Sequence, residues 1–243
     1  PEGVAYGTLA ETLTNNIPKH TYGAGSVVSV SDWPAALAAY VVEYVSGVDY
    51  AQYVKCNIFS PLEMNHTAML PDLSDNEAVQ SGRKEIKSYQ GNMALVNSFY
   101  HMPLYPAGMV TGTADDFHRF ADELLTQDDS SLLFENKETA ETLFDATLCY
   151  TESEEPRVAH GMIVYRLGVP VYGMEGHSAG QTAFVYMEPE SKTCLTYMTN
   201  QYNENQLGND LAEIVFGAVG TEKVDALSGL RVYEGTYVPG NAT

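Results

Sequence analysis

The spacing of apolar residues changes near Pro156, and this change limits the possible folds more than any other feature of the 243-residue sequence. Upstream, apolar residues recur at helical spacing, as in Tyr6, Leu9 and Leu13. Downstream they alternate with polar residues, which is typical of strands with one buried face. We therefore predict an α+β fold, in which an antiparallel sheet with packed helices accompanies a mainly helical and loop region.

The individual elements follow from these periods and from the turn residues between them. Ser31 and Asp32 begin a helix that ends at Gly47, and Thr113 begins another with acidic residues in its first turn. Residues 65–106 have no sustained period and predict long loops with short extended pieces. The expected helices cover residues 3–17, 31–47, 50–58, 113–125, 137–148 and 206–219, and the expected strands cover 158–166, 169–172, 181–188 and 193–199.

These elements predict one structural unit with three parts. Residues 1–155 form the helical and loop region, and residues 156–220 form the antiparallel sheet with its carboxy-terminal helix. Residues 221–243 are expected to be a tail or the start of a following domain.

Charge and composition exclude several classes of function. With 12 Lys and Arg against 32 Asp and Glu, the net charge is −20, which repels nucleic acid and anionic membranes. The longest apolar stretch, residues 33–45, contains Glu43 and is shorter than the ~20 residues of a membrane span. Cys56, Cys149 and Cys194 are unclustered, so they predict neither a disulfide framework nor a metal site. We expect no cofactor, no metal, no nucleic-acid partner and no membrane segment.

Gly176-His177-Ser178-Ala179-Gly180 is the segment most typical of a catalytic site. As a nucleophile elbow it would make Ser178 the nucleophile of an α/β-hydrolase esterase; otherwise it is the wall of a site whose nucleophile lies elsewhere. An elbow joins a strand to a helix, and its histidine comes later in the chain. Residues 181–188 alternate like a strand, and none of the six histidines follows Ser178. The second interpretation is therefore favoured, and the esterase stays as an alternative.

Three separated segments resemble the serine β-lactamase and penicillin-binding-protein family, in particular its class C-related branch. Residues 61–67, Pro-Leu-Glu-Met-Asn-His-Thr, are similar to the family's Pro-Leu-Gly-Met-x-x-Thr signature. Residues 106–110 and 113–116 are similar to its Pro-Ala-Gly-Gly-Leu and Thr-Ala-Asp-Asp segment, and residues 176–180 to its third catalytic motif. The order and spacing agree from about Tyr6 to Val219, so the resemblance implies a partial β-lactamase/transpeptidase-like fold.

The resemblance also implies roles for the residues of the third motif. His177 would be the basic catalytic residue, Ser178 and Ala179 would contact substrate, and the Gly180 N–H would form half of an oxyanion hole. Ala179 stands where the family usually has glycine, so its methyl group is expected to crowd the substrate. The family hydrolyses amides or esters of small molecules or peptides through an acyl-enzyme, outside the cytoplasm in the bacterial periplasm or at the cell surface.

The first two family motifs depart from the pattern. The second, Tyr-x-Asn, falls at Val30-Ser31-Asp32, where valine cannot relay a proton and only Ser31 and Asp32 are left to contact substrate. The first, Ser-x-x-Lys, has no counterpart among the 29 residues before Val30. Residues 81–84, Ser-Gly-Arg-Lys, fit its letters but follow the second motif in a predicted loop.

We therefore expect the carboxy-terminal two-thirds of a hydrolase, inactive by itself and completed by an amino-terminal segment or by a homo-oligomer. The alternative within the family is a catalytically degenerate homologue that binds peptidoglycan-like or peptide ligands without turnover.

Overall fold

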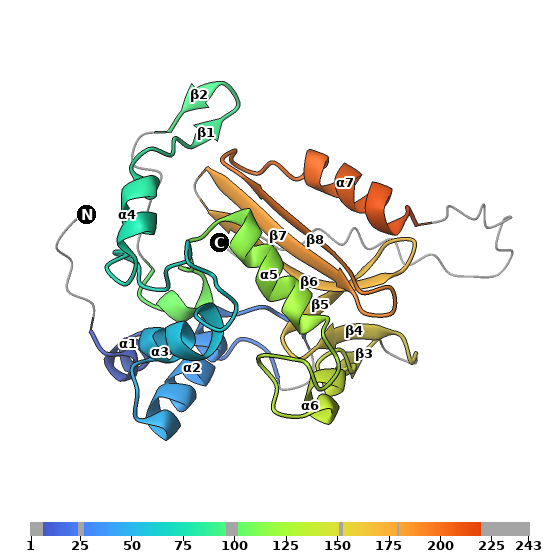
Figure 1. Ribbon diagram of the computed structural model, residues 1–243, viewed down its shortest axis with the longest axis horizontal. Helices are drawn as coiled ribbons and strands as arrows, with labels where there is room; N and C mark the ends of the chain where they lie inside the picture. The colour runs from blue at the N-terminus through green and yellow to red at the C-terminus, as the bar shows by residue number, and fades with distance from the viewer. Residues whose placement is uncertain (1–6, 24–26, 96–101, 151–152, 179, 220–243) are drawn as a thin grey trace, which may run out of the picture.

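The computed structural model describes residues 7–23, 27–95, 102–150, 153–178 and 180–219, and it has the predicted α+β architecture (Figure 1). A six-stranded antiparallel sheet lies beside a region of short helices and loops. The predicted tail after residue 220 and the predicted helix turn around Tyr6 lie outside the described residues.

The amino-terminal helices form where the sequence places them, with shorter bounds. Helix α1, Leu9–Asn15, begins at a capping box in which Thr8 and Glu11 exchange side-chain and backbone hydrogen bonds. Helix α2, Asp32–Ser46, follows Ser31 at its N-cap and ends at Gly47, whose φ of +68° favours glycine. Helix α3, Tyr50–Val54, continues as a π-helical turn, Lys55–Phe59. Their buried side chains share one core with the loops from Leu62 to Met109.

The loop prediction for residues 65–106 is wrong in two places, because the 3-10 helix Tyr105–Ala107 begins at its end and helix α4, Glu77–Arg83, lies within it. Asn76 caps this helix by accepting hydrogen bonds from the Ala78 and Val79 N–H groups. Val79 is its buried residue, so the helix is too short and too polar to show an apolar period. The short extended pieces are a hairpin of β1, Tyr89–Gln90, and β2, Met93–Ala94.

The sheet has the strand order β3-β4-β5-β6-β7-β8, so each strand pairs with its neighbours in sequence. This arrangement needs only short connections, in agreement with the predicted hairpins. The strands are β3, Leu148–Cys149; β4, Pro156–Ala159; β5, Met162–Arg166; β6, Pro170–Ser178; β7, Gln181–Glu188; and β8, Thr193–Thr199.

Several predicted boundaries are wrong, among them that of the last helix, which is predicted to end at residue 219 but ends at Phe216. The single strand predicted for residues 158–166 is two strands, because His160 and Gly161 take positive φ values of +42° and +88° and turn the chain. The helix predicted for residues 137–148 ends early, as α6, Lys137–Thr142, and Leu148 belongs to β3. The strand predicted for residues 169–172 continues to Ser178, since β7 pairs with it over that whole length.

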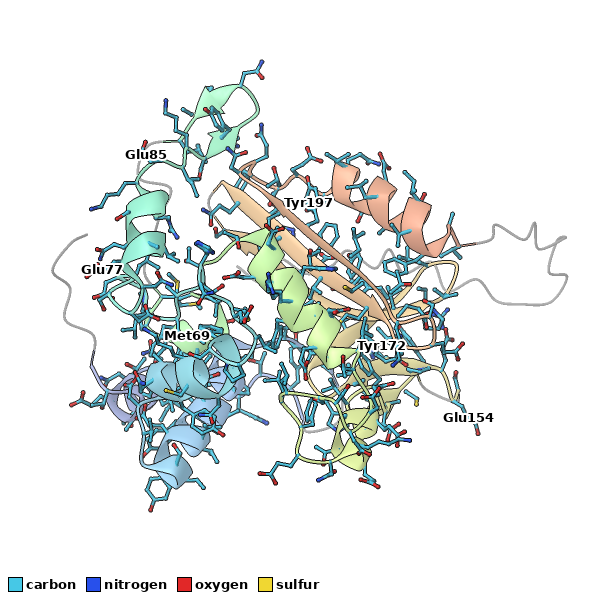
Figure 2. The ribbon with its side chains drawn as sticks, viewed as in Figure 1. Met69, Glu77, Glu85, Glu154, Tyr172 and Tyr197 are labelled. Carbon is cyan, nitrogen blue, oxygen red and sulfur yellow. The ribbon has the colours of Figure 1, made fainter. Side chains whose placement is uncertain are left out.

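Helices cover both faces of the sheet. Helix α5, Ala114–Leu124, packs on the face that contains Tyr172, Val185 and Met187. Helix α7, Gln206–Phe216, packs on the opposite face through Ala212 and Phe216. The labelled Tyr172 and Tyr197 in Figure 2 belong to these two faces, Tyr172 on the α5 face and Tyr197 on the α7 face.

The turn between β7 and β8 is held by the buried carboxylate of Glu188. It accepts hydrogen bonds from the Glu190 N–H at 2.9 Å, from the Ser191 N–H at 2.7 Å, and from the Ser191 hydroxyl. Burial disfavours the charged form of Glu188, but these hydrogen bonds outweigh burial and hold its pKa below the ordinary value.

Asp116 in the first turn of α5 joins this helix to the loop that follows the amino-terminal helices. Its side chain is 3% exposed and accepts hydrogen bonds from the His66 N–H at 2.7 Å and the Thr67 hydroxyl at 2.8 Å. The backbones of Ala68 and Thr111 bond to each other beside it. Two of the three segments that resemble the family are therefore in direct contact through this carboxylate.

We expect Asp116→Ala to lower the free energy of unfolding by about 2 to 4 kcal/mol, because it leaves a buried hydroxyl and a part-buried N–H without an acceptor. Asp115→Ala is the matched control, since Asp115 is an exposed neighbour in the same helical turn, and its cost is expected to stay below about 1 kcal/mol. Urea denaturation of the two variants measures the difference, and equal losses would contradict this role for Asp116.

Candidate functional site

The candidate site lies at the end of β6, where this strand has an open edge. Strand β5 pairs with β6 only from Pro170 to Gly173, whereas β7 pairs with it as far as Ser178. Among the described residues, the outer backbone edge of residues 174–178 therefore has no partner strand. Such an edge offers unpaired N–H and C=O groups to an extended ligand.

His177 and Ser178 point to opposite faces of the sheet, because successive side chains of a strand alternate. His177 pairs with Thr182 and lies on the α7 face together with Glu175. Ser178 pairs with Gln181 on the α5 face, and its hydroxyl lies 3.4 Å from the Gln181 Oε1. The structure thus brings both predicted residues to the same strand end but does not direct them into one pocket.

His177 lies in a small pocket between the strand and α7. The pocket is lined by Glu175, His177, Phe184, Asn205 and Asn209. The Nε2 atom of His177 is 2.9 Å from the Asn205 Oδ1, and the Tyr186 hydroxyl donates a hydrogen bond to Glu175. Burial, and then the Glu175 carboxylate, raise the pKa of Tyr186, so this hydroxyl keeps its proton. The pocket combines a carboxylate, an imidazole and two amides.

Gly180 directly precedes β7, in the tight turn between Ser178 and Gln181, and has a φ of +74°. A side chain cannot be added there, since a Cβ atom would lie 2.3 Å from the Ser88 Cβ and 2.8 Å from the Leu95 Cδ1. Ser88 is 1% exposed, and its hydroxyl has no hydrogen-bond partner among the described residues. The loop around the β1–β2 hairpin therefore packs directly against the expected oxyanion turn. Ala179 lies outside the described part of the chain.

The nucleophile-elbow interpretation of Ser178 is inconsistent with this geometry. The turn after Ser178 leads into strand β7, whereas an elbow leads into a helix. The neighbouring imidazole is on the other face of the strand, bonded to Asn205. Ser178 is therefore not placed as the nucleophile of an α/β-hydrolase.

The predicted second-motif residues lie at the start of α2. Val30 is 63% exposed, Ser31 occupies the N-cap without a side-chain capping bond, and Asp32 is exposed. Within the part of the chain that the structure describes, no hydrogen bond or ion pair joins these three residues to residues 176–180.

Two further nucleophile-type side chains lack the features of a nucleophile. Ser81 lies on α4 rather than in the predicted loop, but both it and Lys84 are exposed. Cys194 lies 3.3 Å from the His118 Nδ1, and burial followed by the charge of Asp122 raises the pKa of this thiol. A thiol that stays protonated is a poor nucleophile.

Residues 5–219 match the family model described as Beta-lactamase. The chain belongs to this family. The resemblance carried by the three separated sequence segments is thereby confirmed at the family level. A comparison with curated protein sequences finds no match.

Solved structures of this fold are similar over most of the chain. The octameric penicillin-binding protein homologue from Pyrococcus abyssi is 17% identical with a TM-score of 0.67, over 87% of this chain and 48% of that chain. The penicillin-binding protein from Bacillus halodurans is 20% identical with a TM-score of 0.65, over 86% and 63%. The D-amino acid amidase from Ochrobactrum anthropi is 19% identical with a TM-score of 0.58, over 72% and 50%. This chain spans about half to two-thirds of the length of these proteins.

Neither Asn205 nor Ser88 can be identified from the motifs, because both contact the site from distant parts of the chain. The sequence signal for Asn205 was its place just before a helix, which suggests a cap and not a histidine partner.

In the described ranges, no helix is long and apolar enough to cross a membrane, and no three His, Cys, Asp or Glu side chains gather as a metal site.

We expect Gly180→Ala to destabilise the protein more than Gly91→Ala, by about 1 to 3 kcal/mol, the cost of overpacking. Both glycines lie in two-residue hairpin turns with positive φ, so alanine is strained at either position. Open space surrounds Gly91, whereas Ser88 and Leu95 crowd Gly180. Thermal unfolding of the two variants isolates the steric part, and equal midpoints would show that the turn is not packed as described.

Proposed function

We propose that this chain provides the substrate-facing strand and half of the oxyanion hole of a serine hydrolase that cleaves an amide or ester through an acyl-enzyme. The observation that carries the proposal is the open edge of β6, which ends in the third-motif residues 176–180. An extended acyl group can pair with this edge, and the Gly180 N–H lies in a turn that is fixed before charge develops. In this proposal Ser178 and Ala179 contact the substrate, and His177 is the basic residue on the opposite face of the same strand end.

Family membership supports the hydrolase class, and the named neighbours suggest the bond. The D-amino acid amidase named above acts on amides, and the Bacillus halodurans protein is a penicillin-binding protein. We propose a small amide or peptide substrate for this chain as well, met outside the cytoplasm as in the family.

We further propose that the chain does not turn over substrate by itself. Val30 lacks the hydroxyl that the family's second motif uses to relay a proton, and no Ser-x-x-Lys precedes it in this sequence. Ser31 and Asp32 then serve substrate contact only. A catalytically degenerate, ligand-binding homologue is the second candidate, and Val30 is the residue that favours it.

The test is mass spectrometry of the chain after incubation with a chromogenic cephalosporin and, separately, with D-phenylalanine amide. We expect no covalent mass increase. In an NMR titration with the same two compounds, we expect reversible chemical-shift changes at Gly176 and Gly180. The same incubation with Ser178→Ala is the control. An acyl adduct on the wild-type chain would overturn the proposal of inactivity, and its loss in Ser178→Ala would restore the esterase alternative.

Exposed apolar side chains on α2 favour contact with a further polypeptide. Leu37, Val41, Tyr44 and Val45 follow one another at helical spacing on one face, and Tyr44 and Val45 are 77% and 79% exposed. Large apolar side chains this exposed along one helix face are typical of a surface that contacts another polypeptide. We propose that further polypeptide covers this face, either an amino-terminal segment of the same protein or a second copy. The exposed large apolar residues between positions 17 and 48 are Ile17, Tyr22, Val27, Val28, Val30, Leu37, Val41, Tyr44, Val45 and Val48.

If this face is a docking surface, the chain by itself should bind a hydrophobic dye and associate in sedimentation velocity at micromolar concentration. We expect the double variant Val41→Glu, Val45→Glu to sediment as a monomer and to bind no more than about half as much dye as the wild-type chain. Ile214→Glu is the matched control, because Ile214 is 78% exposed on α7, away from the patch. Equal behaviour of all three proteins would contradict the docking surface.

A further inference from the structure

Asn205 is the N-cap residue of α7, but its side chain does not cap the helix. It occupies the N-cap of α7, where an asparagine side chain ordinarily accepts a hydrogen bond from its own helix, but it makes no such bond. Its Oδ1 lies instead 2.9 Å from the His177 Nε2, 28 residues away in sequence. The Glu204 carboxylate takes over part of the capping by accepting a hydrogen bond from the Leu207 N–H at 3.0 Å. Local exceptions of this kind concentrate at functional sites.

The first turn of α7 is held close to the sheet, which brings the exposed side chains of Asn205 and His177 within hydrogen-bond distance. Gly208 has no side chain, and a Cβ atom there would lie 2.2 Å from the Phe184 Cε1. Phe184 pairs with Glu175 on β6, two residues before His177. Asn205 therefore approaches His177 from a helix that packs on the strand carrying it.

A neutral histidine has one N–H and one acceptor nitrogen. Because the Asn205 Oδ1 can only accept, the Nε2 of His177 carries the proton and Nδ1 is left as the acceptor. We infer that Asn205 is a positioning residue that fixes the ring orientation and the tautomer of His177. The functional meaning rests on the proposed function, since the fixed ring offers an acceptor nitrogen to a donor group of a bound ligand. The fixed tautomer itself does not depend on that function.

The experiment measures the tautomer directly in the absence of substrate. The protein is labelled with ¹⁵N-histidine, and the Nδ1 and Nε2 shifts of His177 are recorded at a pH well above the ordinary titration range of imidazole. We expect a single Nε2–H tautomer in the wild-type protein. In Asn205→Ala the two shifts should move toward the averaged values of a ring that exchanges between both tautomers.

Three variants separate positioning from general stability. Asn205→Ser keeps a good N-cap residue but is too short to reach the imidazole, so we expect an unchanged melting temperature together with averaged shifts. Asn205→Asp keeps an acceptor oxygen at the same reach and should retain the Nε2–H. Asn209→Ala removes another side chain of the same pocket and should leave the shifts of His177 unchanged.

The inference is overturned if the wild-type shifts are already averaged, or if Asn205→Ser leaves them unchanged. Failure of the proposed function would look different, because it would show as a covalent adduct or as absent ligand binding while the histidine shifts stay those of one tautomer.

Discussion

The carboxylate of Asp116 fixes helix α5, which covers one face of the sheet, to the loop that follows the amino-terminal helices. It is buried at the start of α5, and it satisfies two donors from the loop that follows the helical region. Helix α5 in turn covers one face of the sheet. A buried carboxylate is tolerated only when it is hydrogen-bonded in this way, so the contact between α5 and this loop is costly to break.

The sheet then determines what the candidate site can present. Strand β6 extends beyond β5, so its last residues have an open backbone edge, and the alternation of side chains separates His177 from Ser178. Two different elements then pack against His177 and against the turn that contains Gly180. Helix α7 holds His177 through Asn205, while the loop around the β1–β2 hairpin packs on Gly180. The wall of the candidate site is therefore built from one strand end and two distant segments.

Much of the architecture was predictable because it depends on local patterns. The change from helical to alternating spacing gave the α+β class, and Thr113 and Gly47 marked helix ends through their backbone chemistry. The errors have local causes as well: α4 is capped but carries little apolar surface, and the turn at His160 and Gly161 lies inside an apolar run. Strand pairing with β7, which no single segment reveals, made β6 longer than its own pattern suggests.

The sequence by itself determined the family, the third-motif segment and the absence of a tyrosine at Val30, because these depend on residue identity and spacing alone. Only the tertiary structure decided which face each motif side chain occupies and which partners hold it. Asn205 and Ser88 reach the site through helix and hairpin packing, and such contacts join positions far apart in the chain. The physical reason is that a strand fixes direction by alternation, whereas contact between segments depends on how whole elements pack.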